Sequence, residues 1–179
     1  MLKRDQTVFV LVDVQGKLAQ IVEDSEVLHD NLEKLIKGLQ VMNIPILWLE
    51  QYPDGLGPTT ESLASLLEGQ KPIAKMTFSG ARNEEFMKQL KDLDRKQILI
   101  AGIETHICVY MTAADLAKQD YEVEVVTDAV TSRTEDNKRI GLQKMNALGI
   151  AGTCVETALY ELLGEAGTEE FKQVLKVIK

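Results

Sequence analysis

The segment Thr7–Asp13, TVFVLVD, is a continuous apolar run, rich in β-branched residues, that ends in a carboxylate. Such a run is typical of a strand that is buried on both faces of a parallel sheet. Similar short runs follow along the chain at 44–51, 72–75, 97–102, 122–127 and 150–153. Segments of helical period lie between and after them, at 25–42, from Thr59 onward, and at 84–93, 106–119, 135–148, 155–164 and 168–178. This alternation predicts an α/β fold whose parallel sheet is covered by helices on both faces.

Length and composition are those of one globular unit. The chain has 179 residues, of which 45% are apolar and 27% charged, and no Pro-, Gly- or Ser-rich linker or internal repeat divides it. We therefore expect a single domain over residues 1–179. The net charge of −8 offers phosphate groups no broad positive field, which argues against nucleic acid and anionic membrane as partners.

No apolar stretch reaches the roughly 18 residues that a membrane-spanning helix requires, and Met1–Asp5 begins no secretory signal. We therefore expect a cytoplasmic protein. Cys108 and Cys154 are the only cysteines, too few for a disulfide framework. Each thiol is then either a packing group or a reactive one.

Three chemically reactive side chains follow strands of the expected sheet. Asp13 ends the first strand, Lys75 ends the third, and Cys108 lies a few residues beyond the fourth. Taken alone, each has a structural explanation as a turn residue, a solvated charge or a small packing group. Because ligands of open parallel sheets bind beyond the carboxyl ends of the strands, their coincidence on one rim predicts a site there.

The sequence around Cys108 favours a reactive role for its thiol over a packing role. Residues 102–108, GIETHIC, pass from a strand into a helix that Thr105 can cap. We expect the free amides and the dipole of this helix start to lower the thiol pKa and to receive an oxyanion. Cys154, at the end of the last strand, is better explained by buried packing. His106, only two residues from Cys108, is poorly placed to pair with it on a helix.

Ordered segments over nearly the whole chain resemble the isochorismatase-like hydrolases, and most closely their small bacterial cysteine hydrolases and isochorismatase-domain-containing proteins. These segments are LVDVQGKL around Asp13, LEQYPDGLGPT (49–59), AKMTFSG around Lys75, AGIETHICVYMTAADL (101–116), DAVTSR (128–133) and GTCVETALYELL (152–163).

The resemblance implies a three-layer, Rossmann-like α/β/α fold with a six-stranded parallel sheet in the order 3-2-1-4-5-6. The first and fourth strands are then neighbours, so Asp13 and Cys108 face each other across the crevice. Lys75 starts two strands away, roughly 9 to 10 Å off at the usual strand spacing. Its long side chain must close that gap.

The resemblance also implies roles for these residues: Cys108 as nucleophile, Asp13 as general base and Lys75 as electrostatic partner. It further implies a cis peptide at Ile103–Glu104 and an oxyanion hole built from the backbone amides of Glu104 and Cys108. Nicotinamidases of the superfamily bind a metal after the second strand through an Asp and two His residues. Here that stretch reads EQYPDGLGPTTES, without His, so we predict no metal and no other cofactor.

The leading interpretation is a metal-independent cysteine hydrolase that cleaves a C–N bond of a small amide through a Cys108 thioester. The alternatives are vinyl-ether hydrolysis of an isochorismate-like acid and a non-catalytic, oligomeric binding protein. The resemblance suggests a homo-oligomer, with the helical tail at 155–178 as an interface. By their positions near strand ends, the candidate pocket residues are Gln15, Gln51, Tyr52, Phe78 and Thr105.

Overall fold

A six-stranded, all-parallel sheet in the order β3-β2-β1-β4-β5-β6 forms the centre of the molecule, as expected. The computed structural model describes residues 1–179. The strands are β1 (Thr7–Val12), β2 (Ile46–Gln51), β3 (Ile73–Lys75), β4 (Gln97–Ile103), β5 (Glu122–Thr131) and β6 (Ala151–Thr153). Every residue of β1, β2 and β4 is buried, which explains their unbroken apolar sequences.

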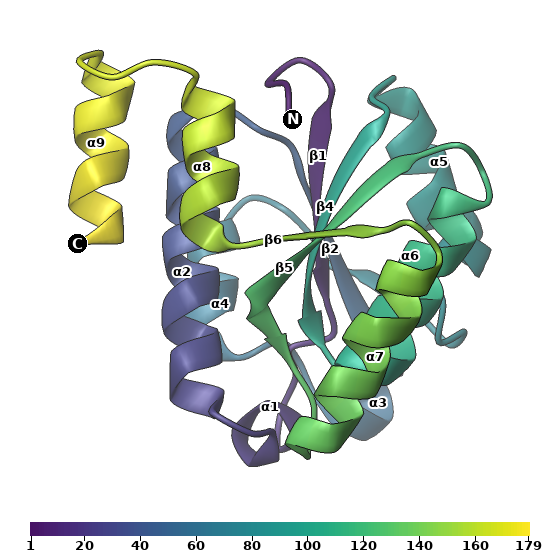
Figure 1. The fold of residues 1–179 in the computed structure, drawn as a ribbon. Helices are drawn as coiled ribbons and strands as arrows, with labels where there is room; N and C mark the ends of the chain where they lie inside the picture. The colour runs from purple at the N-terminus through teal and green to yellow at the C-terminus, as the bar shows by residue number, and fades with distance from the viewer.

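Helices cover both faces of the sheet (Figure 1). One face carries α2 (Ser25–Val41), α4 (Glu61–Ala64) and α8 (Val155–Leu163), and the other carries α5 (Glu84–Asp92), α6 (Tyr110–Ala117) and α7 (Glu135–Ala147). The last helix, α9 (Glu169–Ile178), packs outside α2 and α8. Two short helices, α1 (Leu18–Ile21) and α3 (Pro53–Leu56), lie at the end where the strands terminate. The short 3₁₀ turns are η1 (Ser65–Leu67) and η2 (Gly80–Arg82).

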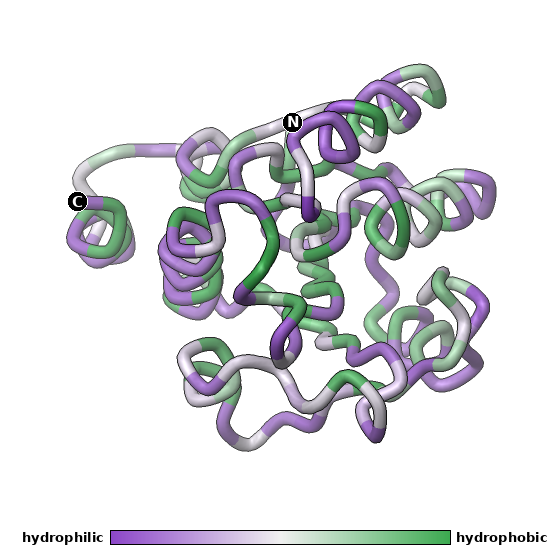
Figure 2. Tube along the Cα trace, turned by 90° about the horizontal axis from the view of Figure 1, so that it is seen from below, coloured by the Kyte–Doolittle hydropathy of each residue, from purple (hydrophilic) through white to green (hydrophobic).

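The apolar residues form one connected cluster of 48 buried side chains between the sheet and its helices. Figure 2 looks at the molecule along the strands and shows these hydrophobic segments gathered at the centre. None of the helices has the length and apolar character needed to cross a lipid bilayer.

The strand register brings the end of β1 between those of its two neighbours. Val12 pairs with Leu49 of β2 on one side and with Gly102 of β4 on the other. Gly102 has a φ of 119°, and a Cβ there would lie 2.1 Å from the Val12 carbonyl oxygen. Only glycine permits this approach, which sets the spacing of the two strands whose ends carry Asp13 and the Cys108 turn.

Several boundaries differ from the sequence-based expectation, and one difference concerns the site. The expected helix over 106–119 is divided into a π-helical turn, η3 (Thr105–Val109), followed by α6. β5 runs to Thr131 instead of 127, because its pairing with β4 resumes after a register shift near Gly102. The turn after β2 contains α3, and the helix expected after Thr59 is only one turn long.

Candidate active site

Asp13 follows β1 directly and is 3% exposed. Its φ of 51° is left-handed, a conformation that Asp tolerates better than most residues, and its N–H donates to the Leu49 carbonyl oxygen at 3.2 Å. The left-handed turn stops the strand and leaves the carboxylate at the carboxyl end of the sheet, at the junction with β2 and β4.

Gln15 is fully buried and ties the end of β1 to the end of β2. Its Nε2 donates to the carbonyl oxygens of Gln51 (3.0 Å) and Gly57 (2.7 Å), and its Oε1 accepts from the Gln51 N–H at 2.6 Å. These three hydrogen bonds use both donors of the Gln15 amide and its oxygen. They fix the backbone from which the Gln51 side chain extends. Gln15 is therefore a support for the site and does not line it.

Lys75 closes the two-strand gap to Asp13. Its Nζ donates to Asp13 Oδ2 at 2.7 Å and to Gln51 Oε1 at 2.6 Å, with Phe78 O at 3.2 Å and Thr77 O at 3.3 Å completing its surroundings. The side chains of Lys75 and Asp13 are 0% and 3% exposed. An ammonium has three N–H donors, so these four acceptors leave it no donor for another anion.

Cys108 lies in the π-helical turn η3 and is 7% exposed. Its Sγ is 3.9 Å from Gln51 Oε1, within hydrogen-bonding range for sulfur. Burial, and then the nearby Asp13 carboxylate, raise the pKa of the thiol to about 12, against the opposing effect of Lys75. The expectation of a lowered pKa was therefore wrong, because desolvation and a neighbouring negative charge outweigh the helix-start amides.

The pKa of the Asp13 carboxyl is raised, like that of the Cys108 thiol. Its pKa is raised chiefly by burial, while the charge and hydrogen bond of Lys75 act to lower it. Asp13 Oδ1 is buried and has no hydrogen-bond partner within the protein. A carboxylate with one unpaired oxygen beside a protonated thiol can act as its proton acceptor, and the ammonium can balance the negative charge wherever it resides.

The backbone before Cys108 offers a hydrogen-bond donor. The Ile103–Glu104 peptide is cis, and the Glu104 N–H donates to no other protein group. The Glu104 carboxylate is held away from the thiol by Arg133, whose N–H and Nε donate to Oε1 at 3.1 and 3.0 Å. A free amide close to a nucleophile is the type of group that stabilises an oxyanion.

Thr105 does not cap the turn, contrary to expectation. The turn begins after Glu104 without a side-chain cap, and the Thr105 hydroxyl is buried and unpartnered. The backbone instead closes on Glu104, whose carbonyl oxygen accepts from the N–H groups of Ile107 (3.1 Å) and Val109 (3.3 Å). This wider turn is the reason why the capping pattern read from the sequence does not apply.

A cavity of about 110 Å³ opens beside the thiol. Its lining consists of Asp13, Leu18, Gln51, Leu56, Phe78, Ile103, Glu104, Ile107 and Cys108. Of the candidate pocket residues, Gln51 and Phe78 line it, whereas Gln15, Tyr52 and Thr105 do not. The apolar members from α1, α3 and η3 were missed because the sequence did not place those short elements over the strand ends.

Cys154 and the two histidines lie outside this cavity. Cys154 is partly exposed and caps α8, where its Sγ accepts from the Thr157 N–H at 3.4 Å, so the expected buried packing role was wrong. His106 Nδ1 lies 3.0 Å from the Ser132 hydroxyl, and His29 Nε2 lies 3.1 Å from the Thr60 hydroxyl. No group of three or more His, Cys, Asp or Glu side chains is arranged to hold a metal ion.

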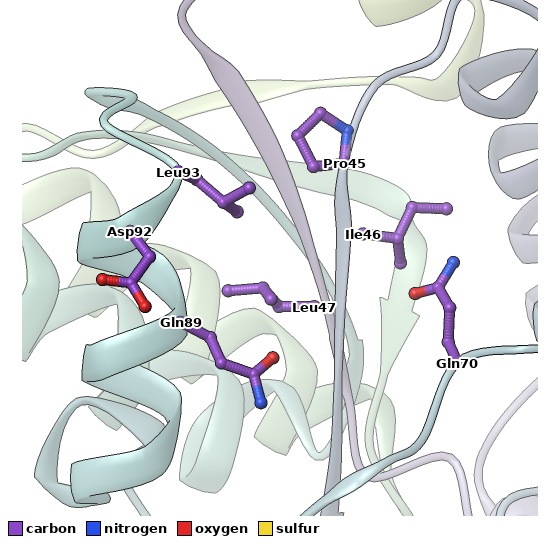
Figure 3. A pocket seen from close by; sticks show the side chains of 7 residues that line it. All are labelled: Pro45, Ile46, Leu47, Gln70, Gln89, Asp92 and Leu93. Carbon is purple, nitrogen blue, oxygen red and sulfur yellow. The ribbon is translucent and has the colours of Figure 1, made fainter.

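Another cavity, of about 410 Å³, lies beside the beginning of β2 (Figure 3). Gln89 and Asp92 of α5 and the following Leu93 form one wall, and the β2 side, with Gln70 beyond it, forms the other. It contains a single ionisable side chain and neither a nucleophile nor a cation. Of these two cavities, the one beside Cys108 therefore has the groups needed for acyl transfer.

Comparison with known proteins identifies the family. Residues 7–158 match the isochorismatase domain. Isochorismatase domain-containing protein 2 of Danio rerio is 33% identical over 173 residues, which cover 96% of this chain and 86% of that protein. The secreted isochorismatase effector Isc1 of Phytophthora sojae is 32% identical over 177 residues, which cover 97% and 84% of the two chains.

Solved structures agree with this assignment. The MAR1 ribonuclease of Caenorhabditis elegans superposes with a TM-score of 0.92 at 30% identity, over 99% of this chain and 91% of that one. YcaC of Pseudomonas aeruginosa, with hexane-2,5-diol and covalent acrylamide, gives 0.92 at 25%, over 98% and 90%. YcaC of Escherichia coli, an octameric hydrolase of unknown specificity, gives 0.92 at 24%, over 98% and 89%. The chain belongs to the isochorismatase family and is a hydrolase of that family.

Proposed function

We propose that the protein is a metal-independent cysteine hydrolase that cleaves the C–N bond of a small amide through a thioester on Cys108. One observation carries the proposal. The buried Asp13–Lys75 ion pair, at 2.7 Å, and the Cys108 thiol share Gln51 as a neighbour at one cavity. A base, a cation and a protonated nucleophile in one small, water-poor site are the components of acyl transfer.

In the proposed first step, Cys108 Sγ attacks the carbonyl carbon of the amide while Asp13 accepts the thiol proton. The raised pKa of Cys108 means that the resting enzyme holds this proton, so the transfer belongs to the attack itself. The carbonyl π electrons move to the oxygen, which becomes the oxyanion received by the amides of Glu104 and Cys108. Lys75 stabilises the charge shared by the thiolate and Asp13.

Collapse of the tetrahedral intermediate breaks the C–N bond, and the amine leaves with the proton held by Asp13. Asp13 is then again a carboxylate and takes a proton from water as the water attacks the thioester carbon. The second intermediate expels the Cys108 sulfur, which recovers that proton, and releases the carboxylic acid. The overall reaction consumes one water and needs no oxidant, reductant or metal.

Two relatives bear on the choice of chemistry. P. aeruginosa YcaC contains covalent acrylamide, a small uncharged amide that reacts with nucleophiles at its vinyl carbon, so that relative has a reactive nucleophile. The C. elegans relative is named a ribonuclease. The net charge of −8 and an ammonium saturated by four acceptors make this chain a poor match for a phosphodiester.

The test is replacement of Cys108 by Ala and by Ser, with Cys154→Ala as the matched control. Ammonia release from a panel of simple primary amides is measured, and rapid-quench mass spectrometry detects the acyl-enzyme. We expect kcat to fall about 10³-fold or more in both Cys108 variants and to stay unchanged in the control. The wild-type mass should increase by that of one acyl group, on Cys108.

Two outcomes would contradict the proposal. If Cys108→Ala retains turnover, the thiol is a bystander, and retained hydrolysis of isochorismate would then support vinyl-ether chemistry. If no amide or ester is hydrolysed although Cys108 reacts with alkylating agents, the binding-protein interpretation takes its place.

We also propose that the protein is cytoplasmic and homo-oligomeric. Two unpaired cysteines fit a reducing compartment. Large apolar side chains are exposed outside the cavity lining, among them Met76 (70%) and Val27 (55%), and subunit contacts would cover such groups. Light scattering after size-exclusion chromatography measures the number of subunits. A monomer at micromolar concentration would contradict the proposed homo-oligomer.

A further inference from the structure

We propose that the cavity selects uncharged substrates whose acyl part is short and apolar, with about four or five non-hydrogen atoms including the carbonyl group. This inference rests on the proposed role of Cys108 as the nucleophile, and it goes further by defining the substrate class. Size, polarity and charge of the lining each support it independently.

The volume limits the acyl group. The cavity beside Cys108 measures about 110 Å³. An apolar protein cavity of about 150 Å³ binds benzene, which has six carbon atoms, so by proportion this one takes roughly four or five. A propionyl or butyryl group is of that size and an acetyl group is smaller, whereas a hexanoyl group or an aromatic acid is too large.

Five of the nine residues that line the cavity have aliphatic or aromatic side chains. Leu18 and Leu56 come from the short helices α1 and α3, Phe78 from the loop after β3, and Ile103 and Ile107 from the end of β4 and from η3. None of these side chains can accept or donate a hydrogen bond, so a hydroxyl or amide on the acyl chain would be buried without a partner. An alkyl chain has no such cost.

No unpaired cation lines the cavity. Asp13, Glu104 and Cys108 are the only ionisable residues in its lining, and the Glu104 carboxylate is paired with Arg133. The nearby cations are already paired, because Lys75 is surrounded by four acceptors and Arg133 is bound to Glu104 and does not line the cavity. A substrate carboxylate would therefore lie close to Asp13 without a counter-ion. The dianionic isochorismate is excluded on the same grounds.

The opening indicates which part of the substrate is less restricted. Asp13, Ile103 and Cys108 are buried, whereas Leu56 and Phe78 are 39% and 57% exposed. The cavity is thus closed at the thiol and open at these two side chains. The leaving amine, which lies beyond the carbonyl carbon, can extend toward this rim, so selection should act on the acyl group and weakly on the amine.

Charge selection can be tested without turnover. Iodoacetamide and iodoacetate have the same size and differ in charge, and Cys154 is a partly exposed internal control in the same chain. Alkylation rates at both cysteines are measured by peptide mass spectrometry. We expect the iodoacetamide-to-iodoacetate ratio to be at least about 10-fold higher at Cys108 than at Cys154. Equal ratios at the two cysteines would overturn the inference.

Size selection is tested with butyramide and hexanamide on the wild type and on Ile107→Ala, with Leu148→Ala as control. Ile107 lines the cavity, whereas Leu148 is half-exposed at the end of α7. We expect the hexanamide-to-butyramide ratio of kcat/KM to rise at least about 10-fold in Ile107→Ala and to stay constant in Leu148→Ala. An unchanged ratio in Ile107→Ala would refute the size limit.

These experiments separate the inference from the proposed function. If no amide is hydrolysed, the proposed function fails while the size limit remains testable by alkylation with 2-bromoacetamide and 2-bromohexanamide. Each rate at Cys108 is divided by the rate at Cys154, which removes the intrinsic reactivity of the reagent. A normalised preference for the smaller reagent, reduced in Ile107→Ala, supports the inference, and its absence overturns it.

Discussion

Replacement of Lys75 by Met tests the buried ion pair most directly. Methionine keeps the length and most of the volume of the lysine stem and removes only the ammonium. Asp13 Oδ2 and Gln51 Oε1, which lie 2.7 and 2.6 Å from Nζ, then lose their donor. Because the two charged side chains are 0% and 3% exposed, water cannot replace it without opening the site.

The expected loss of stability is large. Removing one partner of a buried pair costs about 3–5 kcal/mol, because the other charge stays buried and uncompensated. For a protein of this size, 1 kcal/mol corresponds to about 2–4 °C in Tm, so Tm should fall by roughly 6–20 °C. The loss should shrink as pH falls, because protonation neutralises the unpaired Asp13, whose pKa burial already raises.

Urea unfolding and thermal melting of Lys75→Met, Asp13→Asn and the double variant measure this energy. The matched control is Lys172→Met, because Lys172 forms a 2.6 Å pair with Glu169 at 57% and 78% exposure, where the loss should be below about 1 kcal/mol. The double variant should lose less than the sum of the single losses. If Lys75→Met is as stable as the control, or if the two single losses of stability simply add, Asp13 and Lys75 do not interact as a buried ion pair.

Two further predictions concern Cys108 and its turn. Because burial and Asp13 raise the thiol pKa to about 12, the alkylation rate of Cys108 should keep rising from pH 7 to 10, and a plateau near the ordinary thiol value of about 8.5 would contradict this. A Cβ on Gly141 would lie 2.8 Å from backbone atoms of His106, so Gly141→Ala should displace the turn, cost about 1–3 kcal/mol and lower kcat. Gln143→Ala, exposed on the same helix, should leave melting temperature and turnover unchanged, and equal behaviour of the two variants would refute the effect.

The sheet could be predicted from the sequence because its strands are short, buried and continuous. Continuous β-branched apolar runs such as TVFVLVD are typical of strands covered on both faces, and their number and spacing predicted the α/β class. The strand order came from the family resemblance, and the structure has that order. Placing Asp13, Lys75 and the Cys108 turn at one end of a parallel sheet follows from strand direction alone.

The electrostatics of the site could not be predicted in the same way. A helix start lowers a thiol pKa through amides that are close in sequence, whereas the raised pKa of Cys108 depends on burial and on Asp13, 95 positions earlier in the chain. The contact between Lys75 and Asp13 likewise depends on how far one side chain extends over β2. Such contacts are set by tertiary packing, which no local pattern encodes.

The pocket lining was only partly predictable for a related reason. Gln15 and Gln51 both follow strand ends, yet one amide is consumed by backbone groups and the other faces the cavity. Their sequence contexts do not distinguish the two roles. The leucines of α1 and α3 were missed because single-turn helices lack a periodic signal.

The three-residue length of β3 has a consequence for the temperature range of activity. β3 is the edge strand that supplies Lys75, and it pairs with β2 alone. Short edge strands open locally at lower free energy than the strands at the centre of a sheet. Detachment of β3 would remove the ammonium from Asp13 while the rest of the sheet stays folded. Reversible loss of activity on heating should therefore begin below the temperature of global unfolding.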